Sequence, residues 1–114
     1  MTKIKNYEML IKNKPINRKL YYLGHSSFLI TNSDSAFLMD PWFSKNGAYF
    51  SGWYQWPPNH NCLNIVLSKI KNKKLFIYIS HEHQDHYDIE TLTKILSERE
   101  CCFILPKFKD RFLV

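Results

Sequence analysis

The sequence LFIYISHEHQDHYD, residues 75–88, decides the fold class and the candidate chemistry of this chain. Its first five residues form an apolar run with aromatic and β-branched side chains, which predicts a strand buried on both faces. Three of the chain's five histidines and two of its five aspartates follow within the eight residues 81–88. A histidine cluster that directly follows a buried strand and precedes a helix indicates a metal site.

Helical periodicity flanks this strand on both sides. Apolar residues at 63, 66, 67 and 70 have the i, i+3, i+4, i+7 spacing of a helix that Asn61 could cap. Asp88 could cap a second helix with apolar residues at 89, 92 and 95. Residues 101–105 are another apolar run, ended by Pro106, and predict a second buried strand.

Residues 20–39 have the character of antiparallel strands. The runs 20–23, 28–31 and 36–39 are aromatic or aliphatic, and turn-forming residues separate them at 24–27 and 32–35. Asp40-Pro41 ends the third run, because proline cannot donate a hydrogen bond to a sheet. The order of strands first, then helix-strand-helix-strand, predicts an α/β fold.

Residues 42–60 contain seven aromatic side chains and follow neither a helical nor a strand period. A loop this long in a small domain is usually functional or tied down by packing. Two interpretations stay equal here. The rings line a substrate pocket, or they cover the core.

Length and composition favour one small globular domain. The chain has 114 residues, of which 45% are hydrophobic. Its apolar runs are far shorter than the roughly 20 residues that span a bilayer, and no signal-peptide core is visible, so we expect a cytoplasmic protein. Three cysteines, Cys62, Cys101 and Cys102, do not suit a disulfide framework, and we expect reduced thiols.

The net charge of +6 is concentrated in two segments. Residues 1–18 predict a basic N-terminal arm, and four lysines fall within 69–74. A basic patch can bind an anionic partner such as nucleic acid. The favoured interpretation is a solvated arm and a charged helix end, because no aromatic residue interleaves with the second cluster to stack bases.

The spacing of the cluster predicts two cation sites. In an extended stretch His81 and His83 project to the same side, while Glu82 points away. A turn at Gln84 would let Asp85 and His86 reach a second cation, and these ligand types suit Zn, Fe or Mn. A bridging water would then lose its proton near neutral pH and act as the nucleophile.

Asp40 follows the third strand and is a plausible support for the ligand rings. The alternative for the whole segment is a surface histidine-rich loop that binds adventitious metal. A loop of that kind need not follow a buried strand so closely, so we favour the functional site.

His81-x-His83-x-Asp85-His86 after the strand resembles the metal-binding motif of the metallo-β-lactamase fold. The segment 22–30 and Met39-Asp40-Pro41-Trp42 resemble its opening strands. The chain is most similar to the branch of ascorbate-phosphate lactonases, N-acylphosphatidylethanolamine phospholipase D and cytidine-monophospho-N-acetylneuraminate monooxygenases.

The resemblance implies that His81 and His83 bind a first metal and that Asp85 and His86 bind a second, with zinc the expected ion. Asp85 and His86 are the expected catalytic residues. Asp40 would support the site from behind. His25 would approach it from the hairpin, although a lone histidine beside glycine and serine is more often a turn or core residue.

The resemblance also implies an αββα sandwich of which residues 19–114 are the N-terminal half. After His86 the chain contains no histidine, so ligands expected from later segments are missing. We therefore expect part of a metal-dependent hydrolase that attacks a small, anionic, phosphorylated or acylated molecule and is weakly active alone. A complementary half or self-association would complete it. The alternative is a non-catalytic half-domain that binds nucleic acid or a partner.

Overall fold

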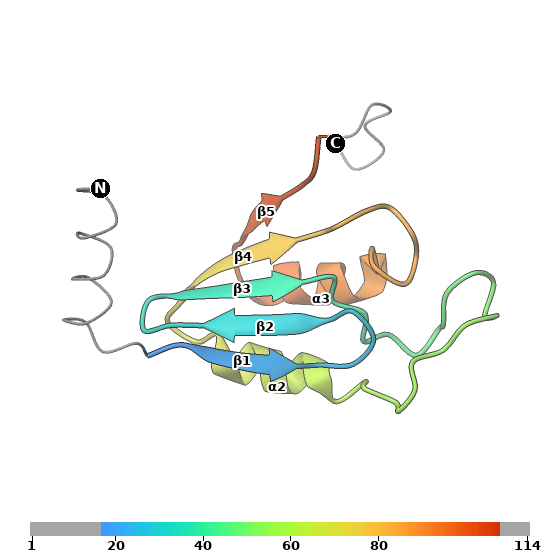
Figure 1. Ribbon diagram of the computed structural model, residues 1–114, viewed down its shortest axis with the longest axis horizontal. Helices are drawn as coiled ribbons and strands as arrows, with labels where there is room; N and C mark the ends of the chain where they lie inside the picture. The colour runs from blue at the N-terminus through green and yellow to red at the C-terminus, as the bar shows by residue number, and fades with distance from the viewer. Residues whose placement is uncertain (1–16, 108–114) are drawn as a thin grey trace, which may run out of the picture.

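The computed structural model describes residues 17–107, and most of the expected basic arm lies outside that range. A five-stranded sheet has the order β1-β2-β3-β4-β5, as Figure 1 shows. The strands are β1 (Lys19–Tyr22), β2 (Phe28–Thr31), β3 (Ser35–Met39), β4 (Lys74–Tyr78) and β5 (Cys102–Ile104). β1, β2 and β3 are antiparallel neighbours, whereas β3, β4 and β5 run parallel. The predicted α/β class is confirmed.

The two helices α2 (Cys62–Lys69) and α3 (Ile89–Glu98) lie behind the sheet in Figure 1 and cover one of its faces. Val66 and Ile70 from the first predicted stripe are fully buried, as is Ile95 of α3. They join a single core with side chains of the sheet, chiefly Leu29, Leu38, Leu75 and Ile77. In residues 17–107 neither helix has the length and apolarity that crossing a membrane requires.

The opposite face of the sheet is covered by no described element. Two cross-strand rows of exposed or partly exposed side chains form an apolar surface that we call the open face: Leu20, Ile30, Phe37, Phe76 and Cys102 in one row, and Tyr22, Phe28, Met39, Tyr78 and Ile104 in the other. Leu20 and Tyr22 are 66% and 64% exposed. The prediction that both faces of β4 are buried is therefore wrong, because the helices that the structure describes pack on one side of the sheet only.

β5 and the helix caps also differ from expectation. All three residues of β5 are exposed, because this edge strand pairs with β4 alone and no described element packs over it. Asn61 and Asp88 occupy the N-cap positions of α2 and α3, but neither side chain caps its helix. The Asp88 carboxylate instead accepts hydrogen bonds from the Thr91 hydroxyl and the Ser44 amide.

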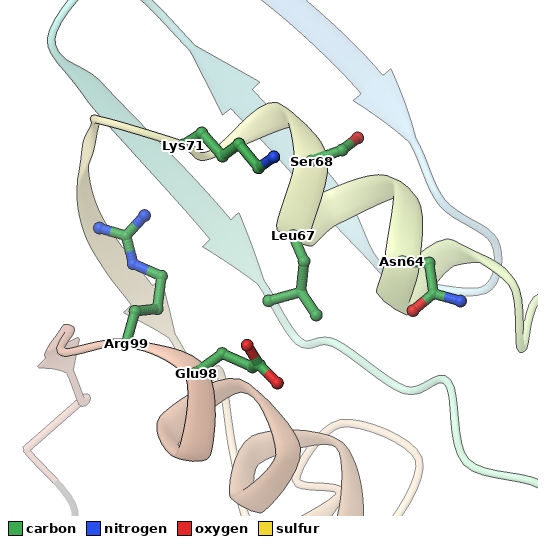
Figure 2. A pocket seen from close by; sticks show the side chains of 6 residues that line it. All are labelled: Asn64, Leu67, Ser68, Lys71, Glu98 and Arg99. Carbon is green, nitrogen blue, oxygen red and sulfur yellow. The ribbon is translucent and has the colours of Figure 1, made fainter.

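A pocket of about 420 Å³ opens between α2 and the C-terminal end of α3 (Figure 2). Arg99, at the end of α3, donates to the carbonyls of Ile70 and Lys73 that follow α2. The arginine therefore ties the two helix ends together. This contact gives Arg99 a structural role.

Candidate metal centre

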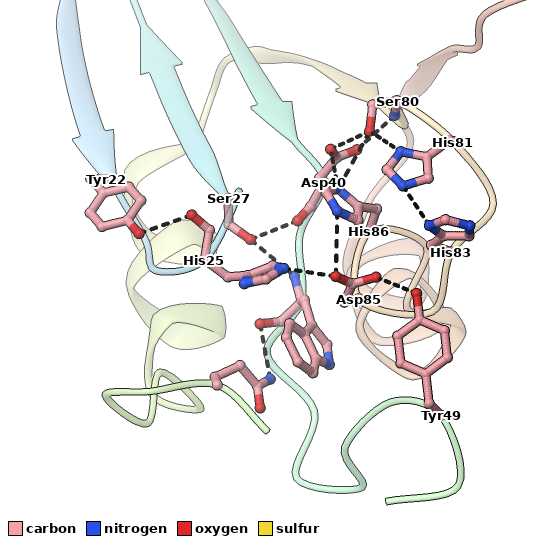
Figure 3. A network of polar contacts seen from close by, with 12 residues as sticks. Tyr22, His25, Ser27, Asp40, Tyr49, Ser80, His81, His83, Asp85 and His86 are labelled. Atoms are coloured by element: carbon pink, nitrogen blue, oxygen red, sulfur yellow. Dashed lines mark hydrogen bonds and ion pairs between the residues drawn. The ribbon is translucent and has the colours of Figure 1, made fainter. Parts of the chain in front are cut away.

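The candidate site forms where the parallel strands β3 and β4 end side by side. Met39 pairs with Tyr78 at the last register position, and the Asp40 amide donates to the Tyr78 carbonyl at 2.9 Å. The segment that follows β4 therefore passes directly beside Asp40 (Figure 3). The carboxyl ends of parallel strands are the usual position of binding sites in α/β folds.

Asp40 is a buried carboxylate with hydrogen-bond donors on both oxygens. Its Oδ1 accepts the Ser80 amide at 2.7 Å, and its Oδ2 accepts the Ser80 hydroxyl at 2.6 Å. His86 donates Nδ1–H to the same Oδ2 at 2.8 Å. This bond leaves the Nε2 lone pair of His86 free, which is the tautomer that a metal-binding histidine backed by a carboxylate adopts.

His25, Asp85 and His86 form a cluster whose ligand atoms all lie within 4.8 Å of one another. His25 Nε2 donates to Asp85 Oδ2 at 2.8 Å, and His86 Nε2 lies 3.5 Å from that oxygen. The Asp85 side chain is only 6% exposed. The chain turns after His83, whose carbonyl accepts the amides of His86 and Tyr87, and this turn carries Asp85 and His86 to the same side.

A tight turn between β1 and β2 presents His25 to the cluster. Gly24 and His25 have φ angles of 98° and 51°, and the Ser27 amide closes the turn on the Gly24 carbonyl at 2.9 Å. The His25 and Trp42 rings make a T-shaped contact, with centroids 5.0 Å apart. His25 therefore reaches the site rather than the core.

His81 and His83 lie next to the cluster but outside the group of described ligand atoms that gather within 4.8 Å. Their Nε2 and Nδ1 atoms are 3.0 Å apart. Ser80 Oγ lies 2.8 Å from Nδ1 of His81, whose ring centroid is 4.0 Å from that of His86. The four histidine rings thus form one contiguous series, because His25 approaches His86, His86 approaches His81 and His81 approaches His83, with centroids 5.6, 4.0 and 4.5 Å apart.

Two opposing effects determine the pKa of Asp85. Burial raises the pKa of this carboxyl, but hydrogen bonds from His25 and Tyr49 and the electrostatic attraction of His86 lower it by more, so the pKa lies below its ordinary value. The pKa of Tyr49 is raised by desolvation, by its hydrogen bond to Asp85 and by that carboxylate's charge. At neutral pH the pair is therefore a phenol donor and a carboxylate acceptor.

The donor set fits a transition-metal ion. Imidazole nitrogen and carboxylate oxygen are ligands of Zn, Fe and Mn. Two ligands about 2 Å from one zinc ion stand about 3.3 Å apart in tetrahedral geometry. The distances from Asp85 Oδ2 to His25 Nε2 and His86 Nε2, 2.8 and 3.5 Å, are of that order.

Sequence reasoning did not single out Tyr49 or Ser80 as site residues. Ser80 stands inside the quoted stretch directly before His81, so its position was available as a signal. Tyr49 was one of seven aromatic residues in the loop 42–60, and only the folded loop distinguishes it. His60, the remaining histidine, lies apart and contacts the Phe43 carbonyl at 3.0 Å.

A mixed sheet with imidazole and carboxylate groups at the ends of its parallel strands defines an α/β domain with a candidate metal site. The chain belongs to the beta-lactamase superfamily domain family, whose sequence profile matches residues 19–107. This match confirms the family to which the motif and the opening strands pointed.

Curated relatives occur in mycobacteria. A protein of Mycolicibacterium smegmatis is 33% identical over 86 residues, and proteins of two Mycobacterium tuberculosis strains are 34% identical over 86 residues. Their names designate them provisionally as Rieske 2Fe-2S iron–sulfur proteins. Each alignment covers 75% of this chain but 15% of the relative, so the chain spans a small part of those proteins. No solved structure matches the chain significantly.

Proposed function

We propose that this chain supplies metal ligands to a metal-dependent hydrolase that uses activated water against a small, anionic, phosphorylated or acylated molecule. The observation that carries the proposal is the His25–Asp85–His86 cluster, with Asp40 behind His86. Zinc is the ion that we propose. Iron and manganese accept the same ligand types. The lactonase and phospholipase branches that the sequence resembles suggest the substrate class.

A bound ion would supply a water of lowered pKa and would polarise a phosphoryl or carbonyl oxygen. Residues of the chain orient the side chains that would hold the ion. The Asp40 carboxylate accepts a hydrogen bond from Nδ1–H of His86 and so directs Nε2 into the site. Asp85 and His86 are the proposed catalytic residues, and the 3.0 Å approach of His81 and His83 supports them as further ligands.

The open face supports the proposal that residues 19–114 are one half of an αββα sandwich. A sheet face with exposed Leu20, Tyr22 and Ile30 is the kind of surface that a further layer buries. We propose that a complementary segment or a second copy covers this face and adds the missing ligands. The chain alone should then be a weak catalyst. Its three free thiols support a reducing compartment, and we propose the cytoplasm.

The Rieske names of the relatives do not supply a second candidate function. A Rieske centre needs two cysteine and two histidine ligands. Cys62 begins α2, and Cys102 pairs with Phe76 within the sheet rather than at the ends of β3 and β4 where the histidines gather. The described cysteines and histidines therefore do not form such a set.

Metal titration of the chelator-treated chain tests the proposed function. We expect Zn²⁺ to bind by isothermal titration calorimetry, and Asp85→Ala with His86→Ala to abolish that binding. His60→Ala is the matched control, because this histidine contacts the Phe43 carbonyl outside the cluster. Unchanged stoichiometry in the double variant would reject the assignment.

Turnover of generic phosphodiester and lactone substrates tests the incompleteness of the site. We expect little hydrolysis by the zinc-loaded chain alone. Robust turnover that disappears in the double variant would support the hydrolase but contradict the half-domain proposal.

A further inference from the structure

Tyr49 reaches the candidate metal centre from the aromatic loop. Its hydroxyl donates to Asp85 Oδ1 at 2.9 Å across 36 residues of sequence. His25 donates to the other oxygen, Oδ2, at 2.8 Å. Figure 3 shows the two side chains approaching the Asp85 carboxylate from different elements. Asp85 is therefore held at both oxygens, which prevents the carboxylate from rotating.

Further contacts connect Tyr49 to the same segment. Its amide donates to the Gln84 side-chain oxygen at 2.5 Å, so backbone and side chain of Tyr49 bind two consecutive residues of the motif. The Tyr49 ring makes T-shaped contacts with Trp53 and His83, with centroids 5.1 and 6.3 Å apart. These contacts fix the direction of the phenol.

The backbone that presents Tyr49 adopts an unfavourable conformation. Tyr49, Phe50 and Ser51 have consecutive positive φ angles of 55°, 56° and 64°. The left-handed conformation is unfavourable for residues other than glycine. Paired hydrogen bonds between Ala48 and Trp53, at 2.9 and 3.1 Å, close the turn around them. Such conformations persist where surrounding contacts enforce them, and they are concentrated at functional sites.

We propose that Tyr49 is a positioning residue for Asp85: its hydroxyl holds Oδ1 so that Oδ2 faces His86 and the ion they would share. This inference rests on the proposed function and assigns a role within that site. Filling space does not require the oxygen, because phenylalanine would provide the same ring. The hydroxyl is the part of the side chain that reaches the ligand, so the two roles can be separated by experiment.

The test compares Tyr49→Phe with Tyr54→Phe in the chelator-treated chain. Tyr54 stands in the same loop and is 57% exposed, so its variant matches the chemical change at a position away from Asp85. We expect Tyr49→Phe to weaken Zn²⁺ binding by about 10- to 100-fold, the range for residues that orient metal ligands. The Co²⁺ absorption spectrum should also change, because it reports the geometry of the ligands. Tyr54→Phe should alter neither readout.

A second variant, Gln84→Ala, keeps the test decisive if Tyr49→Phe fails to fold. Gln84→Ala removes the acceptor of the Tyr49 amide while keeping the phenol and the ligands. We expect weaker Zn²⁺ binding here too, with thermal melts of the metal-free proteins confirming that they fold. Wild-type Zn²⁺ affinity and an unchanged Co²⁺ spectrum in the folded variants would overturn the role of Tyr49 but not the proposed function. Failure of the unmodified chain to bind metal would overturn the proposed function together with it.

Discussion

Asp40 and His86, 46 residues apart, are joined by a 2.8 Å hydrogen bond between Oδ2 and Nδ1. Asp40 is 2% exposed and lies beyond β3, whereas His86 lies in the turn before α3. This bond connects the antiparallel half of the sheet to the segment that carries the histidines. The stability of the fold and the orientation of the candidate ligand therefore depend on the same carboxylate.

Replacement of Asp40 should destabilise the fold strongly. Asp40→Ala leaves the Ser80 amide and His86 Nδ1–H without their acceptor, and an unpaired buried polar group costs about 1–3 kcal/mol. We expect the free energy of unfolding to fall by about 2–4 kcal/mol, measured by urea denaturation of the metal-free chain. Asp40→Asn keeps one acceptor oxygen and should lose less. Equal urea midpoints for wild type and Asp40→Ala would contradict this account.

The stability of the metal-free chain should fall at acidic pH through Asp85. Burial raises the pKa of this carboxyl, but its hydrogen bonds and the electrostatic attraction of His86 lower it by more. The unfolded chain therefore takes up the proton at a higher pH than the folded chain does. The stabilisation is fully present above the ordinary carboxyl pKa of about 4 and is lost as the pH falls through the lower folded value.

Urea denaturation between pH 7 and pH 3 measures this dependence. Asp85→Asn should lose stability less steeply below pH 4 than the wild type. Asp34→Asn, at an exposed turn position, should follow the wild-type curve. Parallel curves for wild type and Asp85→Asn would show that the carboxylate makes no such contribution.

The core should depend on the buried side of α3. Ile95 is fully buried against the sheet, whereas Ile89 of the same helix is 64% exposed. Ile95→Ala removes the same atoms as Ile89→Ala but leaves a cavity, which costs about 2–5 kcal/mol. Ile89→Ala should change stability by about 0.5 kcal/mol or less. Similar urea midpoints for the two variants would mean that α3 does not pack as described.

The sequence was sufficient for the elements that local periodicity determines. Strands expected at 28–31 and 36–39 correspond to Phe28–Thr31 and Ser35–Met39, and the stripe over 63–70 corresponds to Cys62–Lys69. Burial was harder to predict, because a run such as 101–105 is apolar whether or not another layer covers it. The exposure of β5 follows from its edge position, which no local pattern encodes.

The candidate site also has a part that the sequence predicts and a part that it does not. Asp85 and His86 belong to one short motif, so their proximity follows from a single turn. Tyr49 reaches Asp85 through consecutive left-handed residues, and none of these is glycine, so the sequence contains no local signal for that conformation. Long-range contacts that depend on unusual backbone angles are the part of a site that spacing alone does not predict.

The open face should make the isolated chain self-associate. Leu20 and Ile30 are paired across β1 and β2, and both side chains are exposed on that face. The double variant Leu20→Glu/Ile30→Lys places opposite charges at paired positions, which is compatible with the sheet but unfavourable for apolar contact. Sedimentation velocity over a concentration series should therefore show association for the wild type and a smaller average mass for the variant.

Ile65→Glu provides the control for this experiment. Ile65 is 40% exposed on α2, across the sheet from the open face, so the variant adds a charge without changing that face. It should associate as the wild type does. A wild-type chain that sediments as a monomer at every concentration would contradict the prediction, because an apolar sheet face of this extent would then be stable in water without a partner.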